Sequence, residues 1–362
     1  MLACFHKEDY AKGNNFIWKA DMQAYSYLNS LWQRGKDFLG VDVPILAGAM
    51  TWVSERYLVS AISNAGGFGV IACGAMEPHH LDEEIRETKK LTKRPFGVNL
   101  ITLHPALNEL IEVCIQHRVS HIILAGGLPN AESIKAVKNA GIKMICFAPA
   151  LALARRLVRM GVDALVIEGH EAGGHIGPVT TSVLAQEIIP ALKEVPVFVA
   201  GGIGRGEAIL SYLEMGASGC QLGTRFVCAS ECRAHPKFKQ AFIRASSRDA
   251  IISPQLDARF PVIPVRALEN EGTQKFIEFQ RQVIQQVNAG EVDLKEGQLK
   301  IEKYWAGALR RAVIDGDIET GSVMAGQSVG LVDKEQPAKE IIEELIAQAI
   351  ITIEMREKVK IA

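Results

Sequence analysis

Short apolar runs alternate with amphipathic stretches from residue 43 onward. This alternation is typical of βα units arranged around a parallel sheet. Eight runs follow one another at intervals of about 25 residues: VPILAG (43–48), GVIA (69–72), FGVNL (96–100), HIILA (121–125), KMICF (143–147), ALVIE (164–168), VFVA (197–200) and GCQLG (219–223). The runs are apolar on both faces, as in strands covered on both sides, and a doubly wound open sheet would show the same feature. Eight units favour a TIM (β/α)8 barrel.

Segments with helical periodicity lie between the runs, for example at 54–65, 151–160 and 205–215, and several are followed by a glycine that would end the helix. The alternation of apolar runs and amphipathic stretches stops after residue 225, and this change indicates a division of the chain into separate parts. We expect a helical N-terminal extension over 1–40, a barrel over 41–229, a smaller inserted helical domain over 230–320, and a return segment with a C-terminal helix over 321–362.

Composition narrows the possible partners. The 362 residues suit one barrel of roughly 250 residues with an elaboration. Lysine and arginine number 40 against 41 acidic residues, so no global field favours nucleic acid or an anionic membrane. The sequence shows neither the apolar stretch of a signal peptide nor a run long enough to span a bilayer. We expect a small-molecule substrate, no nucleic acid, no membrane, and a cytoplasmic location.

The seven cysteines indicate reduced thiols and no metal site. They are scattered through apolar segments and include no C-x-x-C pair. Cys228 and Cys232 are four residues apart, but no nearby pair of histidines or cysteines completes a set of zinc ligands.

Chemistry-bearing residues gather directly after the last three runs. The segments are EGHEAGGHIG (168–177), AGGIG (200–204) and GTRF (223–226). Active sites of (β/α)8 barrels form at the C-terminal ends of the strands, and the loops after the last two strands commonly hold a phosphate. Glycines there let amide groups approach a ligand, although any one of them can serve only to turn the chain. The pattern predicts a phosphate-bearing cofactor, with Arg225 as a further source of positive charge.

Six segments, in this order, resemble the nitronate monooxygenase superfamily, which includes the FabK-type enoyl-ACP reductase II branch. They are VPILAGAMTWVSERYLVSAISNAGGFGVIACG, KRPFGVNL, EGHEAGGHIGPVTT, VPVFVAGGI, GCQLGTRFV and GALRRAVIDGDIETGSVMAGQSVGLV. The resemblance runs from about residue 40 to 335. It implies a TIM barrel with a small inserted domain and FMN as the cofactor.

The resemblance also implies which residues contact FMN, in four groups. They are Ala49, Met50 and Thr51 along the flavin; Asn99 at the ring or ribityl chain, with Gly173 and Gly174 near the isoalloxazine; Gly201, Gly202, Gln221, Gly223 and Thr224 around the phosphate and ribityl chain; and Met324, Ala325, Gly326 and Gln327, which return from the small domain and close the site.

His175 stands where this family has its catalytic histidine, and imidazole suits acid/base work near neutral pH. In an enoyl-thioester reduction it would polarise the thioester or supply the α-proton. In a nitronate oxidation it would take a proton from the carbon beside the nitro group. A purely structural histidine is the alternative. Glu168 and Glu171 could orient the imidazole or cap the next turn, and for His170 we expect a structural role.

Other polar and aromatic residues have less specific interpretations. We expect His104, His117, His121 and His235 at the surface or at helix ends. Trp52 and Phe226 either flank a flat substrate or belong to the core. The cluster Lys89, Lys90, Lys93 and Arg94 is either a solvated helix end or a surface for an acidic carrier protein.

The expected activity is reduction of an enoyl thioester by NADH or NADPH, because the G-G-H-I-G and G-S-V-M-A-G-Q segments are most similar to the FabK branch. Three alternatives stay open: a nitronate monooxygenase that uses O2, an NAD(P)H:quinone or flavin reductase, and a non-catalytic flavin-binding protein. No Rossmann fingerprint is present to distinguish NADH from NADPH. An acyl carrier protein is a candidate partner, and a homodimer is a candidate assembly.

Overall fold

Eight parallel strands close into a barrel in the computed structural model, which describes residues 22–257, 259 and 264–361. Each of the eight apolar runs contains one strand, so the predicted TIM barrel is confirmed. The strands are β1 (Ile45–Ala47), β2 (Gly69–Ala72), β3 (Phe96–Ile101), β4 (His121–Ala125), β5 (Lys143–Phe147), β6 (Ala164–Glu168), β8 (Val197–Ala200) and β9 (Gly219–Leu222). Their order around the sheet is β1-β9-β8-β6-β5-β4-β3-β2. A bridge between Leu46 and Phe68 joins the two ends.

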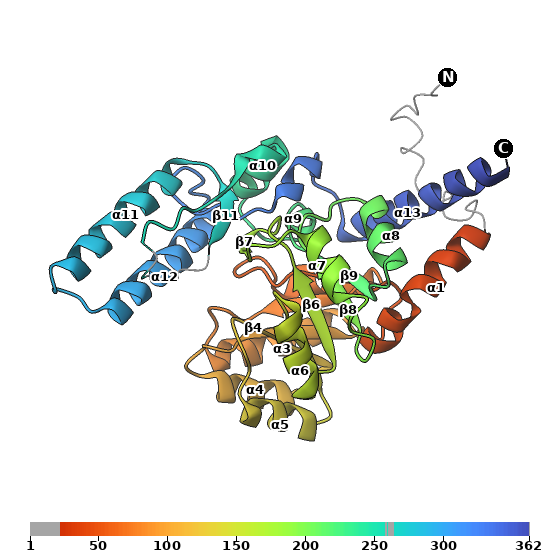
Figure 1. The fold of residues 1–362 in the computed structure, drawn as a ribbon, viewed down its shortest axis with the longest axis horizontal. Coiled ribbons are helices and arrows are strands. Elements are labelled where there is room, and N and C mark those ends of the chain that lie inside the picture. Colours follow the sequence, from red (N-terminus) through yellow and green to blue (C-terminus); the bar gives the residue numbers. More distant parts are fainter. Residues whose placement is uncertain (1–21, 258, 260–263, 362) are drawn as a thin grey trace.

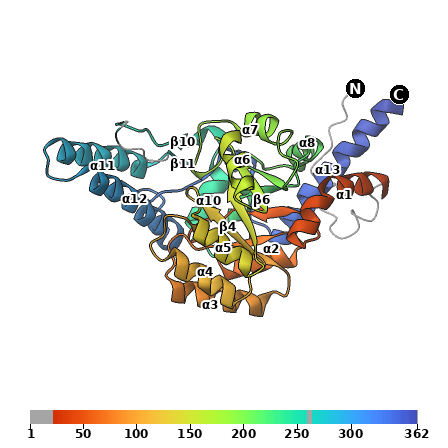
Figure 2. The ribbon, with the colours of Figure 1, turned by 60° about the horizontal axis from the view of Figure 1, so that its bottom comes forward.

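Helices cover the outside of this barrel, as Figures 1 and 2 show. They are α2 (Arg56–Asn64), α3 (Pro78–Leu91), α4 (Leu107–Gln116), α5 (Ala131–Asn139), α6 (Leu151–Arg159), α7 (Thr181–Ile188) and α8 (Gly206–Glu214). Local sequence sets their ends: the side chain of Asn130, for example, accepts the Ser133 amide at 2.7 Å and caps α5. None of the helices within the described ranges is long and apolar enough to cross a membrane.

Strand periodicity gives the barrel a separate interior core. Leu46, Phe68, Ile123, Val166 and Phe198 belong to the cluster that fills it, while the intervening strand residues pack outward against the helices. One layer further toward the C-terminal ends of the strands, the same alternation places Asn99, Glu168 and Gln221 on the inner face. Polar side chains therefore cap an apolar barrel at this end.

His121 occupies the opposite end of the interior, and the expectation of a surface position was wrong. Its side chain is 2% exposed, between the rings of Phe38 and Phe68 at centroid distances of 5.2 and 4.9 Å. The reason is strand register: residue 121 begins β4, and its side chain faces inward like that of Ile123 two residues later. Burial lowers the pKa of His121 to about 4.

A smaller lobe follows the barrel and stands to one side of it in Figures 1 and 2. The segment after β9 runs through α9 (Thr224–Val227), α10 (Pro236–Arg244), η3 (Ser247–Asp249), β10 (Ala250–Ile252), β11 (Val265–Leu268), α11 (Glu271–Asn288), α12 (Leu294–Arg310) and the π-helical segment η4 (Arg311–Asp315). The lobe is not purely helical, because β11 pairs antiparallel with β10 and with the short strand β7 (Gly174–His175). That sheet joins the lobe to the loop that follows β6.

The chain ends with η5 (Gln327–Leu331) and helix α13 (Ala338–Ile361), and α13 packs against α8, α2 and α1 (Met22–Leu39). In Figure 1, α1 and α13 lie together on the side of the barrel away from the small lobe. Helix α1 buries Leu28 and Trp32, so this part of the N-terminal extension belongs to the packed fold. Residues 1–21 of that extension lie outside the described residues.

Candidate active site

The loop after β6, the end of β9 and the return segment meet at the C-terminal end of the barrel. The Gly326 amide donates to Thr224 Oγ1 at 3.0 Å, and the Gln327 amide donates to the Glu171 carbonyl oxygen at 2.9 Å. A Cβ atom on Gly173 would lie 2.5 Å from the Gly326 nitrogen, so no side chain fits there. Three of the four predicted FMN-contact groups are thus in direct contact.

The loop after β8 joins the same cluster through two glycines. Gly201 and Gly202 have φ angles of 96° and 72°, a region that residues with a Cβ rarely adopt. A Cβ on Gly201 would lie 3.0 Å from the Gly169 carbonyl oxygen, and a Cβ on Gly202 would lie 3.0 Å from Glu171 Cβ. Both glycines therefore allow this loop to pack closely against the loop that carries His175.

The loop after β1 reaches the cluster from the other side. A Cβ on Gly223 would lie 3.4 Å from Met50 Sδ, so Met50 reaches the end of β9. Ala49 packs against the barrel interior, and a Cβ on Gly74 would lie 2.9 Å from Thr51 Oγ1. The predicted flavin-side segment therefore runs along the end of the barrel between β2 and β9.

Three side chains of the inner polar layer face the space between these loops. Asn99 and Gln221 are buried, and Asn99 Nδ2 donates to the Ile123 carbonyl oxygen at 3.2 Å, which leaves its Oδ1 as an acceptor. Burial raises the pKa of Glu168 from 4.5 to about 8, with no charged neighbour contributing. This shift favours the neutral carboxylic acid, which can donate a hydrogen bond as well as accept one.

His175 lies on β7, and the small lobe fixes its backbone. It pairs with Val265 of β11, and the next residue, Ile176, donates its amide to the Pro264 carbonyl oxygen at 2.9 Å. Its side chain is exposed to solvent. The preceding Gly174 has a φ of 72°, and a Cβ on it would lie 3.6 Å from Met324 Sδ. The return segment and β11 therefore flank the histidine.

Arg266 is a functional candidate that the sequence analysis did not single out. Its buried guanidinium donates to the His170 carbonyl oxygen at 3.0 Å and to the Ala250 carbonyl oxygen at 2.6 Å. It thereby ties the loop between β6 and β7 to the small sheet. The sequence offered one signal, a single arginine inside the apolar run FPVIPVRAL. An arginine buried in such a run needs hydrogen-bond acceptors such as these carbonyl oxygens.

The other acidic and histidine residues of this loop have structural partners. The Glu171 carboxylate accepts the Thr181 amide at 2.8 Å and the Thr181 hydroxyl at 2.9 Å at the start of α7, so it caps that helix. His170 Nδ1 lies 3.0 Å from the Gly177 carbonyl oxygen and holds the loop closed. Of the two glutamates proposed to orient the imidazole, Glu171 is thus engaged elsewhere.

Two further candidates lie away from the cluster. The buried guanidinium of Arg225 donates to Glu344 on α13 at 2.8 Å, so its charge is paired with that carboxylate. Phe226 is fully buried in the core, whereas Trp52 is 38% exposed at the barrel end. Within the described ranges, no group of three or more His, Cys, Asp and Glu side chains could hold a metal ion.

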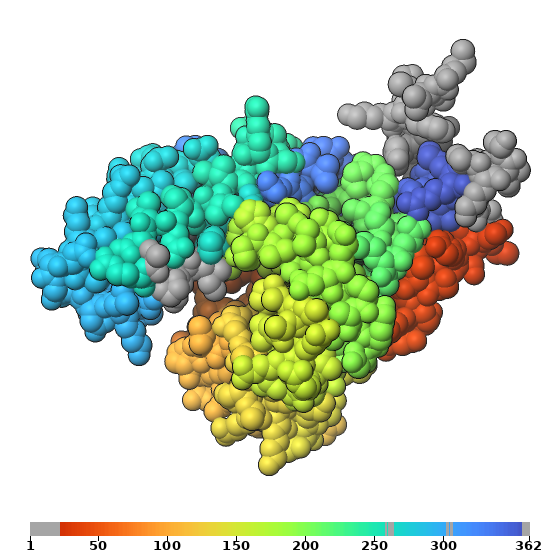
Figure 3. Space-filling model, viewed as in Figure 1, coloured from red at the N-terminus to blue at the C-terminus, as the bar shows by residue number. Residues whose placement is uncertain are grey.

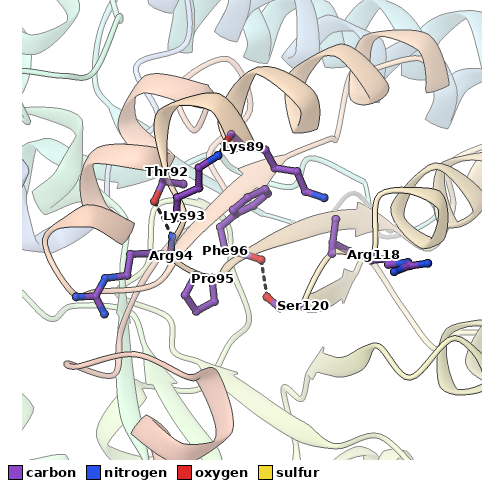
Figure 4. A pocket seen from close by; sticks show the side chains of 9 residues that line it. Lys89, Thr92, Lys93, Arg94, Pro95, Phe96, Arg118 and Ser120 are labelled. Atoms are coloured by element: carbon purple, nitrogen blue, oxygen red, sulfur yellow. Dashed lines mark hydrogen bonds between the residues drawn. The ribbon is translucent and has the colours of Figure 1, made fainter.

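Lys89, Lys93 and Arg94 of the basic cluster line a hollow of about 430 Å³ at the opposite end of the barrel (Figure 4). Pro95 and Ser120, which precede β3 and β4, lie in its wall. Lys89 donates to the His117 carbonyl oxygen, and Arg94 pairs with Asp42 at 3.1 Å. In Figure 4, Arg94 and Arg118 point away on opposite sides. These contacts agree with a solvated helix end, and the hollow is not part of the site described above.

Comparison with known proteins gives consistent similarities. The family model described as nitronate monooxygenase matches residues 33–348. A Mycobacterium tuberculosis protein named (3aS,4S,5R,7aS)-5-hydroxy-7a-methyl-1-oxo-octahydro-1H-indene-4-carboxyl-CoA dehydrogenase is 29% identical over 87% of this chain and 95% of its own length. A nitronate monooxygenase of Paraburkholderia phytofirmans is 29% identical over 61% of this chain and 73% of its own length. The solved structure of FabK from Thermotoga maritima is 36% identical, covers 90% of this chain and 98% of its own, and has a TM-score of 0.81.

Proposed function

From the premise that this chain belongs to the nitronate monooxygenase family of FMN-type oxidoreductases, we propose that it reduces an enoyl thioester with NADH or NADPH. The observation that carries the proposal is the position of His175, whose backbone is fixed by β11 at the end of the barrel and follows Gly174, the neighbour of Met324. The similarity to FabK and to a carboxyl-CoA dehydrogenase supports a thioester as the substrate class.

The residues at the barrel end fit FMN. Thr224 Oγ1 accepts the Gly326 amide, so its own proton is free to donate to a phosphate oxygen, beside the glycines of the β8 loop. Asn99, Glu168 and Gln221 offer donors and acceptors to a flat polar ring system, and Met50 and Met324 offer apolar contact. Bound FMN supplies the two-electron carrier between the nicotinamide and the substrate.

In this proposal His175 completes the reduction by moving one proton. Hydride addition to the β-carbon leaves negative charge on the α-carbon and the thioester oxygen, and imidazolium can donate a proton to the α-carbon. Because the side chain of His175 is exposed, it can recover its proton from water. The products balance as a saturated thioester and NAD(P)⁺, formed from an enoyl thioester, NAD(P)H and one proton.

An apolar rim supports a substrate with an acyl chain. Leu103 follows β3 and is 79% exposed, and Leu128 follows β4 and is 37% exposed. Both side chains stand at the same end of the barrel as His175. A carrier docked at the basic hollow of Figure 4 would be at the wrong end to present its thioester to this histidine. We therefore expect the carrier, CoA or an acyl carrier protein, on the side of the small lobe.

Anaerobic stopped-flow absorbance of the purified flavoprotein tests the proposal. NADH or NADPH should bleach the flavin, and crotonyl thioester should restore its colour. Bleaching by an alkyl nitronate but not by either nicotinamide would replace the proposal with the nitronate monooxygenase activity. Bleaching by nicotinamide with reoxidation by a quinone, and none by the thioester, would identify a quinone reductase instead.

A further inference from the structure

Trp52 has a backbone conformation that a large side chain rarely adopts. Its φ angle is 68°, in the left-handed region where glycine and asparagine are the usual residues. A bulky aromatic residue in this region costs free energy, and such positions cluster at sites that bind ligands. The strain alone assigns no role, so the surroundings of the side chain matter.

A tight turn imposes this conformation and directs the ring outward. Ser54 Oγ donates to the Gly48 carbonyl oxygen at 2.9 Å and accepts the Met50 amide at 3.0 Å. The Val53 amide also donates to the Met50 carbonyl oxygen at 3.0 Å. Trp52 is the residue that this turn leaves 38% exposed, directly after the segment that lines the candidate active site.

The exposed ring faces an arginine from the small lobe. The Arg310 guanidinium carbon lies 5.9 Å from the centroid of the Trp52 ring. Arg310 is the last residue of α12 and is followed by the π-helical segment η4, a local geometry that is frequent at functional sites. One of its nitrogens contacts Asp315 at 3.1 Å, which engages only part of its set of five donors.

A second aromatic and guanidinium pair lies at the same junction between barrel and lobe. The Arg233 guanidinium is 4.4 Å from the centroid of the Tyr57 ring, and both side chains are exposed. Tyr57 lies in the first turn of α2, five residues after Trp52. The His235 amide donates to the Val313 carbonyl oxygen of η4 at 2.7 Å, so the loop of Arg233 is fixed to the segment that follows Arg310.

We propose that Trp52 and Arg310 form a subsite for the adenine nucleotide part of a substrate. The indole ring offers a stacking face to adenine, and the guanidinium offers planar donors to phosphate oxygens. Figure 3 shows the surface hollowed between the small lobe and the barrel. The inference rests on the proposed function, because NAD(P)H and a CoA thioester both carry adenine and phosphates. The two sources share this chemistry, and the experiment separates them.

The test measures binding apart from turnover. Isothermal titration calorimetry of the FMN-loaded protein would use two unreactive probes, ADP-ribose for the nicotinamide source and free CoA for the thioester source. The variants are Trp52→Gly, which removes the ring and relieves the left-handed backbone, Trp52→Phe, which keeps a ring, and Arg310→Gln. Arg159→Gln on the exposed face of α6 is the matched control. Flavin absorbance and melting temperature establish that each variant is loaded and folded.

We expect Trp52→Gly and Arg310→Gln to weaken one probe roughly 5- to 100-fold, the scale of a lost base stack, with partial recovery in Trp52→Phe. A loss confined to CoA assigns the thioester, and a loss confined to ADP-ribose assigns the nicotinamide. Unchanged affinity for both probes, or a fall in melting temperature without any loss of affinity, would overturn the proposed subsite. Trp52 and Arg310 would then serve only to hold the small lobe against the barrel. Crotonyl-N-acetylcysteamine, a thioester without a nucleotide, tests the proposed reaction separately, because its failure to reoxidise wild-type enzyme leaves the binding result intact.

Discussion

At the scale of single residues, His175 carries the chemistry of the proposal. Its side chain is exposed, and its backbone is held by β11 irrespective of the side chain. We therefore expect His175→Ala to retain FMN and to slow turnover by roughly 10²- to 10⁴-fold, the usual scale of lost acid/base catalysis. Steady-state kinetics with flavin absorbance measure both effects. His79→Ala, on the exposed part of α3, is the control, and unchanged turnover in His175→Ala would remove this residue from the mechanism.

Glu168 gives a pH-dependent prediction in the FMN-free protein. Its pKa is raised by burial from 4.5 to about 8, so between these values the unfolded chain releases the proton while the folded chain keeps it. The unfolded state then binds fewer protons, and the free energy of unfolding must fall as pH rises through this interval. Above pH 8 this group should contribute no further change.

The matched variant is Glu168→Gln, which keeps a neutral side chain of similar shape at every pH. Urea unfolding from pH 5 to 9 should show wild type losing stability relative to Glu168→Gln as pH rises, with the difference levelling off near pH 8. Parallel curves across this range would mean that the carboxyl group is ionised in the folded protein as it is in the unfolded one.

At the scale of elements, the sequence was most informative where periodicity is strong. All eight barrel strands were predictable because each lies in a short, mostly apolar run that alternates with amphipathic helices. Strand β7 has two residues, which is too short for any period to appear, and its partner β11 is distant in sequence. The small sheet that holds His175 was therefore not predictable. The inward direction of Glu168 was available from strand alternation, but only with the barrel register known.

Arg266 makes the position of β7 depend on the lobe, and this dependence can be tested. In Arg266→Gln the shorter neutral side chain cannot hold both the His170 and Ala250 carbonyl oxygens, so the loop that carries His175 should loosen. We expect kcat to fall about 10- to 100-fold, the scale of a misplaced catalytic group, while the KM for the nicotinamide changes little.

Arg248→Gln, at a side chain that is almost fully exposed, is the matched control. Positioning also predicts that the pH profile of kcat broadens or shifts in Arg266→Gln, because the environment of His175 is less defined. A proportional loss of kcat and of folded protein, with the profile unchanged, would assign Arg266 to stability alone.

At the scale of the whole molecule, the last helix supports the site from behind. Arg225 directly follows Thr224, and its buried side chain reaches Glu344 on α13, where Gln336 and Gln348 also donate to the same carboxylate. Helix α13 in turn packs against α1, α2 and α8. The segment that follows the small lobe thus supports the site at two points. Gly326 contacts Thr224 directly, and Glu344 contacts Arg225, the residue after Thr224. The resemblance implied that Gly326 returns to the flavin site, whereas the sequence analysis considered Arg225 only as a further source of positive charge for a phosphate.

This arrangement predicts a large effect from a residue distant from the chemistry. Arg225 is 2% exposed, and its Nε and Nη1 atoms have no hydrogen-bond partner among the described residues, so Glu344 is its main compensation. Glu344→Ala would leave a buried unpaired charge and should lower the free energy of unfolding by about 3 kcal/mol, the low end for broken buried pairs, because 29% of the Glu344 side chain remains exposed.

Urea unfolding measures that loss, with Glu340→Ala on the exposed face of α13 as the control. The double variant Arg225→Met with Glu344→Leu removes both charges and should recover most of the stability, since apolar replacements of buried ion pairs are often neutral. Glu344→Ala should also bind FMN more weakly, because Thr224 is adjacent to the released arginine. A double variant less stable than Glu344→Ala would show that the ion pair itself, rather than relief of an unpaired charge, holds α13 against the barrel.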